Sequence, residues 1–128
     1  MCGANRYELS DDSPWSAYCH CESCRKHTGA PVAVLIAGKP ERVSWTKGER
    51  KRYESSAGRF RAFCNDCGTS LTWETDNDGG WLGVHSSTLD NPDALPPTDH
   101  VFHAEAVDWL KIDDDLPRFE GSKFITPA

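Results

Sequence analysis

The sequence predicts an all-β domain, and three features of the chain support this prediction. Apolar and aromatic residues are grouped in short runs of strand length, several of them rich in β-branched residues. Glycine, proline, asparagine and aspartate separate these runs and favour turns. Only residues 25–29 and 91–95 show the pattern of a short helical turn. The 128 residues predict a single domain over residues 1–128 with one modest core.

The first half of the chain alternates predicted strands with turns. A short strand is expected at Arg6–Leu9 and a turn at Asp11–Pro14, and Trp15–Tyr18 leads into the first cysteines. The helical turn at 25–29 can end at its glycine, which adopts a left-handed conformation easily. Pro31–Ala37 is the most apolar run. Because it is short, β-branched and bounded by proline and glycine, it predicts a strand buried on both faces.

The second half predicts further short strands. A hairpin around residues 47–49 is expected from Val43–Thr46 and Arg52–Ser55. Residues 76–80 form a strong turn signal. Additional strands or short apolar segments are expected at Arg59–Phe63, Leu71–Glu74, Trp81–Ser86, Val101–His103 and Val107–Leu110. Core packing is expected for the five tryptophans, which are Trp15, Trp45, Trp73, Trp81 and Trp109.

Charge and hydropathy exclude some classes of function. The formal net charge is −6 and the sequence pI is about 5.3, which argues against a nucleic-acid or anionic-membrane partner, since both favour a basic face. No apolar run approaches the roughly 18 residues of a transmembrane helix. Nothing at residues 1–6 looks like a signal peptide, so a cytoplasmic protein is expected. The apolar content of 38% is low, so metal ions are expected to supply part of the folding energy.

Five of the six cysteines lie in two short clusters, at residues 19–24 and 64–67. Thiolates suit zinc, and the Cys-x-x-Cys spacing lets two sulfurs reach one ion. The denser cluster of Cys19, Cys21 and Cys24 can occupy three corners of one ion and leave the fourth open, as in catalytic zinc sites. Spacing alone also allows one four-cysteine site that combines Cys21 and Cys24 with the pair at 64 and 67. A disulfide framework is less favoured, because the cysteine fraction is below the roughly 8–10% of such scaffolds.

Motifs along nearly the whole chain point to a known family. They are Cys-x-Cys-x-x-Cys-Arg at 19–25, Thr-Gly-Ala-Pro at 28–31, Ser-Ala-Gly-Arg-Phe-Arg-Ala-Phe-Cys-x-x-Cys-Gly-Thr at 56–69, Ala-Leu-Pro-Pro-Thr-Asp-His at 94–100, and Leu-Pro-Arg-Phe at 116–119. In this order they resemble the glutathione-dependent formaldehyde-activating enzyme (GFA) family, whose domain is shared with centromere protein V. The resemblance implies a β-tent-like fold of several small coiled antiparallel sheets, two zinc ions and a carbon–sulfur lyase type of activity.

The resemblance also implies ligands for the two ions. The zinc regarded as catalytic would be held by Cys19, Cys21 and Cys24. The structural zinc would be held by Cys64, Cys67 and an N-terminal Cys-x-Cys pair, of which this sequence contains only the second member, Cys2. Either the natural chain starts further upstream or this site has lost a ligand. A water, a histidine or the N-terminal amine could fill the fourth position.

The expected substrate is a small thiol such as glutathione, in an adduct with an aldehyde such as formaldehyde (S-hydroxymethylglutathione). Arg25 and Lys26 are candidate clamps for its anionic groups, with a solvated helix end as the alternative. His27 is the best candidate for a general acid–base. Arg59 and Arg61 alternate with apolar residues, so they are expected on the outer face of a strand. The rival interpretations are a non-catalytic zinc domain that binds a protein partner, and a metal-releasing redox sensor.

Overall fold

The computed structural model describes residues 1–10 and 15–123, and it confirms the all-β class. The turn predicted at 11–14 lies outside the described residues. The described part contains one α-helix, α1 (Glu22–Thr28), and the strands β1 (Arg6–Leu9), β2 (Trp15–Cys19), β3 (Ala33–Gly38), β4 (Val43–Lys47), β5 (Lys51–Ser56), β6 (Arg59–Phe63), β7 (Ser70–Thr75), β8 (Trp81–His85) and β9 (Asp99–Val101). Short 3₁₀ turns lie at Pro40–Arg42, Asn77–Gly79, Ser86–Thr88, Pro92–Ala94 and His103–Glu105, which confirms the helical turn expected at 91–95.

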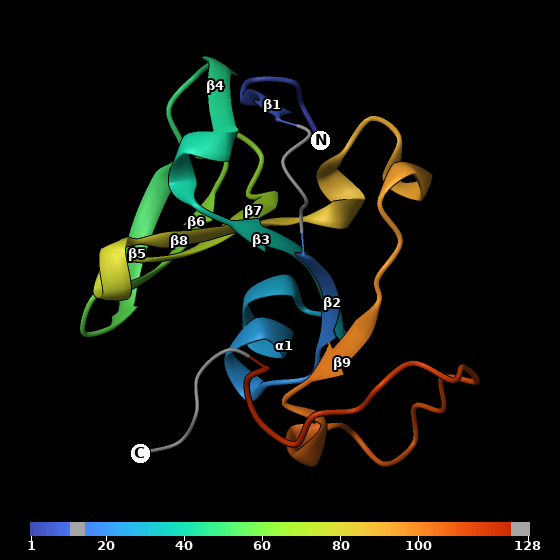
Figure 1. The fold of residues 1–128 in the computed structure, drawn as a ribbon. Coiled ribbons are helices and arrows are strands. Elements are labelled where there is room, and N and C mark those ends of the chain that lie inside the picture. Colours follow the sequence, from blue (N-terminus) through green and yellow to red (C-terminus); the bar gives the residue numbers. More distant parts are fainter. Residues whose placement is uncertain (11–14, 124–128) are drawn as a thin grey trace.

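The strands form two sheets. β1 pairs with β4, and the remaining strands form a sheet in the order β5-β6-β7-β8-β3-β2-β9. All pairs are antiparallel except β2–β9, which is parallel. Figure 1 shows the small sheet at one end of the molecule and α1 near the other end, beside the C-terminal loops. No helix of the described chain has the length and apolar character that crossing a bilayer requires.

β3 is the strand buried on both faces that its sequence predicts. It lies between β8 and β2, and Leu35, Ile36 and Ala37 are all buried. Successive residues of a strand point to opposite faces. Leu35 therefore joins the core on the side of α1 and β9, while Ile36 packs with Leu82 and Val84 on the other side. A strand buried on both faces explains why this run is continuously apolar.

The predicted hairpin between Val43–Thr46 and Arg52–Ser55 is wrong. Both segments are strands, but β4 pairs with β1, and β5 pairs with β6. Tyr7 of β1 and Trp45 of β4 make an edge-to-face ring contact with centroids 5.5 Å apart. Gly48 turns the chain between the two sheets with φ +75°, where a Cβ would lie 2.1 Å from the Ala4 carbonyl oxygen. Long-range packing, rather than the local turn, therefore decides which strands pair.

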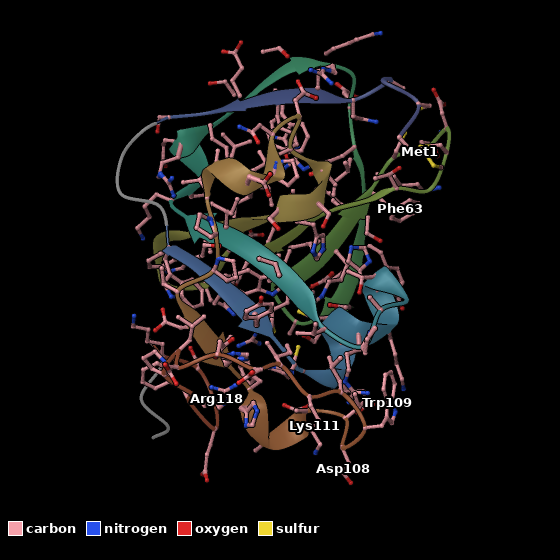
Figure 2. All side chains as sticks on the ribbon, turned by 90° about the vertical axis from the view of Figure 1, so that its right-hand side faces the viewer. Met1, Phe63, Asp108, Trp109, Lys111 and Arg118 are labelled. Carbon is pink, nitrogen blue, oxygen red and sulfur yellow. The ribbon has the colours of Figure 1, made fainter. Side chains whose placement is uncertain are left out.

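The prediction that all five tryptophans pack in the core is wrong for Trp109. Trp109 is 72% exposed, in an irregular segment rather than in a strand. Figure 2 shows it with Asp108 and Lys111 at the end of the molecule opposite β1 and β4.

Candidate functional site

The first cysteine group lies where β2 meets α1. Cys19 ends β2, Cys21 caps the N-terminus of α1, and Cys24 lies in the first turns of that helix. The Cys21 sulfur accepts a hydrogen bond from the Cys24 backbone N–H at 3.3 Å. Gly29 ends the helix in a left-handed conformation and donates to the Arg25 carbonyl, as the sequence predicts. All three sulfurs lie within 4.8 Å of one another, and we call them the inner cysteine group.

The sulfur spacing of the inner cysteine group fits a metal ion. The Cys19 and Cys21 sulfurs are 3.5 Å apart, close to the roughly 3.8 Å between sulfurs bound tetrahedrally at about 2.3 Å from zinc. Hydrogen bonds from Cys19 and Cys24 lower the pKa of Cys21 to about 2, whereas hydrogen bonds with Cys21 and Cys24, with burial, raise the pKa of Cys19. The protein alone thus favours one thiolate stabilised by thiol donors. A bound cation allows every sulfur of the group to ionise.

A second group, which we call the outer cysteine group, consists of Cys2, Cys64 and Cys67. The Cys2 and Cys64 sulfurs are 3.7 Å apart, and Met1 and Phe63, the residues that precede them, lie together in Figure 2. Gly68, at φ +78°, donates to the Cys64 carbonyl and so closes the turn that carries Cys67. Hydrogen bonds from the hydroxyl and backbone of Thr69 lower the pKa of Cys67 to about 6. This group also fits a metal ion, and Cys2 leaves it exposed to solvent.

The positions of the two cysteine groups distinguish between one four-cysteine site and two three-cysteine sites, both of which the sequence spacing allows. Cys64 and Cys67 associate with Cys2, so the single site that would combine them with Cys21 and Cys24 is wrong. The six cysteines are free rather than disulfide-bonded. Within the described chain, neither group includes a fourth histidine, cysteine or carboxylate at the same spacing. Each group therefore offers three protein ligands.

Arg61 contradicts the expectation that it lies on an outer face. Its side chain is largely buried, with 9% of the residue exposed, and Nη1 donates a hydrogen bond to the Cys24 sulfur at 3.1 Å. Period-two alternation correctly places Arg59 and Arg61 on one face of β6, and both line the cavity beside the cysteines. Arg59 is exposed, as expected, whereas the alternation does not reveal that Arg61 is buried.

The inner cysteine group borders a cavity of about 320 Å³, which we call the cysteine cavity. All three cysteines contribute to its lining, together with Ser23, Glu105, Ser122 and the two arginines of β6. Its apolar walls are formed by Trp15, Leu35, Ala37, Trp73, Val101 and Phe102. Phe102 has a left-handed backbone conformation, with φ +52°, which is uncommon for a bulky residue. Apolar walls around a few polar groups are typical of small-molecule sites.

The other predicted site residues lie around α1. Lys26 and His27 line a neighbouring cavity of about 330 Å³, which we call the side cavity. Arg25 lines neither of these two cavities, and its Nε donates to the His20 carbonyl at 3.1 Å. Burial, followed by the charge of Arg61, lowers the pKa of His27, so its ring is neutral at pH 7.

A chain of polar side chains behind the inner cysteine group is not evident in the sequence. His20 Nε2 lies 2.8 Å from His100 Nδ1, and His100 Nε2 lies 2.9 Å from an oxygen of Asp114. Arg118 donates to the other Asp114 oxygen at 3.0 Å. The motifs at 94–100 and 116–119 contain His100 and Arg118, but only the fold brings them to the loop between Cys19 and Cys21. The contact between His100 and His20 anchors that loop, and Asp114 and Arg118 in turn position His100.

The fold and the two cysteine groups define an all-β domain whose cysteines could hold two metal ions. Residues 1–105 match a protein family that is described as "Glutathione-dependent formaldehyde-activating enzyme". The chain belongs to this GFA family.

Two relatives extend the comparison. The chain is 30% identical over 98 residues to an uncharacterized lyase of Schizosaccharomyces pombe, with 70% of this chain and 71% of that protein covered. The crystal structure of a Rhodobacter sphaeroides protein has the same fold, with a TM-score of 0.60 at 18% identity. That match covers 91% of this chain and 94% of the other. The second match shows the fold alone.

Proposed function

We propose that the protein is a zinc-dependent carbon–sulfur lyase that acts on a thiol–aldehyde adduct such as S-hydroxymethylglutathione, formed from glutathione and formaldehyde. One observation carries the proposal. The inner cysteine group has three sulfurs, lacks a fourth ligand among the described residues, and borders the cysteine cavity. Three protein ligands beside a cavity leave a coordination position for a substrate, whereas four would make the site structural.

Zinc held by Cys19, Cys21 and Cys24 would bind an incoming thiol as its thiolate. The residues of the chain supply the surroundings. Arg61 donates to the Cys24 sulfur and offsets part of the negative charge of the three thiolates. The apolar walls exclude water from the reacting atoms, which strengthens electrostatic interactions in the cavity.

The reaction itself balances without an oxidant or a reductant. A sulfur lone pair forms the carbon–sulfur bond, the carbonyl π pair moves to oxygen, and that oxygen takes one proton. The reverse reaction breaks the carbon–sulfur bond and returns the proton. We propose His27 as the group that exchanges this proton, because its neutral ring can accept one from a substrate that extends between the two cavities.

The proposed clamps are Lys26 and Arg25, which adjoin the inner cysteine group in sequence. Lys26 lines the side cavity, where it can attract an anionic substrate. Arg25 holds the His20 carbonyl, so its contribution to binding would act through the ligand loop. A cytoplasmic location, where thiols stay reduced, suits the six free cysteines.

Zinc stoichiometry together with an adduct assay tests the proposal. The wild-type protein is expected to contain two zinc ions and to accelerate exchange between glutathione, formaldehyde and their adduct, as measured by NMR. Cys21→Ser should lose one ion and nearly all activity. Cys67→Ser is the matched control, because it should lose the other ion and keep activity. Full activity in Cys21→Ser would contradict the catalytic assignment, and zinc-loaded wild type without activity would favour a non-catalytic zinc domain.

A further inference from the structure

Three buried nitrogen atoms between α1 and the large sheet have no hydrogen-bond partner among the described residues: His27 Nε2, His85 Nε2 and Arg61 Nε. We propose that the three nitrogens share one buried water molecule, and that His85, by holding this water, positions His27 for proton exchange. The water site stands independently of the reaction, whereas its use in proton exchange rests on the proposed function. His85 lies outside every sequence motif described above.

The pairing of the strands places Arg61 and His85 on one face of the sheet. Arg61 of β6 pairs with Trp73 of β7, and Trp73 pairs with Gly83 of β8. Residues that are directly paired share a face of the sheet, and so do residues two positions apart along a strand. His85 follows Gly83 by two positions, so its side chain points to the same side as that of Arg61.

Helix α1 covers this face and adds His27. Leu35, the partner of His85 in β3, belongs to the core cluster that contains Cys24 of α1. The ring centroids of His27 and His85 are 5.4 Å apart, with the ring planes at 44°. His27 and Arg61 both line the side cavity. The three nitrogens without partners therefore belong to neighbouring side chains.

Burial makes an additional partner for these nitrogens necessary. His85 is only 5% exposed and Arg61 only 9% exposed. A buried polar atom without a hydrogen bond costs free energy, and nearly all such atoms in proteins bond either to the protein or to ordered water. A buried water typically makes about three hydrogen bonds to groups that would otherwise be unsatisfied, which is the number that this cluster offers.

The chemistry of the nitrogens favours water over an ion. Arg61 is positively charged, and no carboxylate of the described chain forms an ion pair with it, so a metal cation would be repelled. Burial lowers the pKa of His27, and a backbone hydrogen bond with Ala62 acts in the opposite direction, as expected when a ring N–H donates to a carbonyl. Because Nε2 has no partner, this bond uses Nδ1, and Nε2 of the neutral ring is an acceptor. An anion cannot donate to it, whereas a water can accept from Arg61 and donate to His27.

The water is the route by which a proton reaches His27. Nε2 accepts the proton and is buried, so the proton must pass through the group that is bonded to it. The water takes a proton from the substrate oxygen and gives one to Nε2, and the reverse steps return it. After the transfer, His27 and Arg61 both donate to the water, so a hydrogen of the water needs an acceptor.

His85 provides this acceptor. Burial, followed by the charges of His27 and Arg61, lowers the pKa of His85 to about 3, so its ring is neutral at pH 7. In the tautomer with hydrogen on Nδ1, its Nε2 has a free lone pair. His85 lines neither the cysteine cavity nor the side cavity, so it acts through the water and is a positioning residue.

The test combines a crystal structure of the zinc-loaded wild type with two variants of His85. Density for a water is expected within about 3.2 Å of all three nitrogens. His85→Phe keeps a ring but removes its nitrogens, and loss of the acceptor disfavours protonated His27. At pH 7, kcat for adduct exchange should therefore fall about tenfold with KM unchanged, and the acid limb of kcat should move to lower pH by about 0.5–1 pH unit. His85→Gln is the matched control, because its amide lies near the position of Nε2 and should keep both values near wild type.

The outcomes separate this inference from the proposed function. A water bonded to all three nitrogens in a zinc-loaded wild type without activity would support the water site and contradict the proposed function. An active wild type whose three nitrogens share no water would overturn the inference and leave the function intact, and this structure decides the site even if His85→Phe does not fold. Equal kcat values and acid limbs in wild type and His85→Phe would overturn the role of His85. Equal losses in His85→Phe and His85→Gln would also overturn it, because the ring shape rather than the hydrogen bond would then matter.

Discussion

Arg61 of β6 and Cys24 of α1 are joined by a hydrogen bond of 3.1 Å between a guanidinium nitrogen and a cysteine sulfur. The bond connects the seven-stranded sheet to the helix that contains Cys24 and is capped by Cys21. Cys24 is 2% exposed, so this contact is shielded from water. A charge-assisted bond in such a place fixes the position of the sulfur and reduces its negative charge.

Replacement of Arg61 by glutamine should reduce activity more than it reduces zinc binding. A hydrogen bond to a charged group contributes about 1.5–3 kcal/mol, so kcat/KM for the adduct should fall about 10- to 100-fold, while the zinc content stays near two. Arg59→Gln is the control, because Arg59 lines the same cavity and no hydrogen bond from its side chain to a cysteine is found. Steady-state kinetics of both variants decide the matter. Equal losses would mean that only the net charge of the cavity matters.

Arg61 also shows how far sequence reasoning reaches. Alternation along β6 places Arg59 and Arg61 together on one face, and a polar face is normally directed to solvent. Here it faces a cavity, which only the packing of α1 against the sheet reveals. The inner cysteines can be recognised as candidate metal ligands because they lie close together in the sequence. The contact of His20 with His100 spans 80 residues, and no local pattern encodes it.

The two cysteine groups should release metal at different rates. Cys19 and Cys24 are buried, whereas Cys2 is exposed and Cys67 is only partly buried. A chelator should therefore remove one zinc ion quickly from the outer group and the second slowly, as measured with a chromogenic zinc indicator. Cys67→Ser should abolish the fast phase alone. Two ions released at one rate in the wild type would contradict this prediction.

Glu74 should contribute to stability at neutral pH and lose that contribution in acid. The carboxylate is nearly buried and bonds with Arg50, Arg52 and Thr72. Burial raises its pKa, but the bonds from Arg50 and Thr72 outweigh burial and lower the pKa below 4.5. A lowered carboxyl pKa stabilises the fold above the unfolded value and ceases to do so as pH falls through the folded value.

Glu74→Gln should therefore lower the free energy of unfolding by about 2 kcal/mol at pH 7, a value reduced for the partial exposure of both arginines. The difference between variant and wild type should shrink as the pH falls below 4.5, the unfolded value, and through the lowered pKa of the folded protein. Urea unfolding at several pH values measures this difference. The control is Glu54→Gln on the exposed strand β5, which should change stability little. A difference that does not depend on pH would mean that the loss comes from packing.

The strands themselves were easier to predict than their partners. β4 and β5 are both present, yet each pairs elsewhere, because the Tyr7–Trp45 contact and the core beneath it favour β1 beside β4. Local sequence encodes the propensity for strand and turn, whereas pairing depends on contacts between distant segments. The exposure of Trp109 has the same origin, since an apolar residue is buried only where another surface covers it.

His27→Gln tests the proposed proton transfer. Burial lowers the pKa of His27 below 6.5, so the ring is neutral and able to accept a proton at pH 7, and it becomes protonated only in more acidic solution. Wild-type kcat should therefore fall in acid along a limb whose midpoint lies below pH 6.5. In the variant, kcat should be about 100-fold lower and this limb absent, because loss of a general base typically removes a factor of this size. Zinc content and melting temperature should stay near wild type, which separates a chemical role from a structural one. An unchanged acid limb in His27→Gln would assign the titration to another group and leave His27 as part of the side-cavity wall.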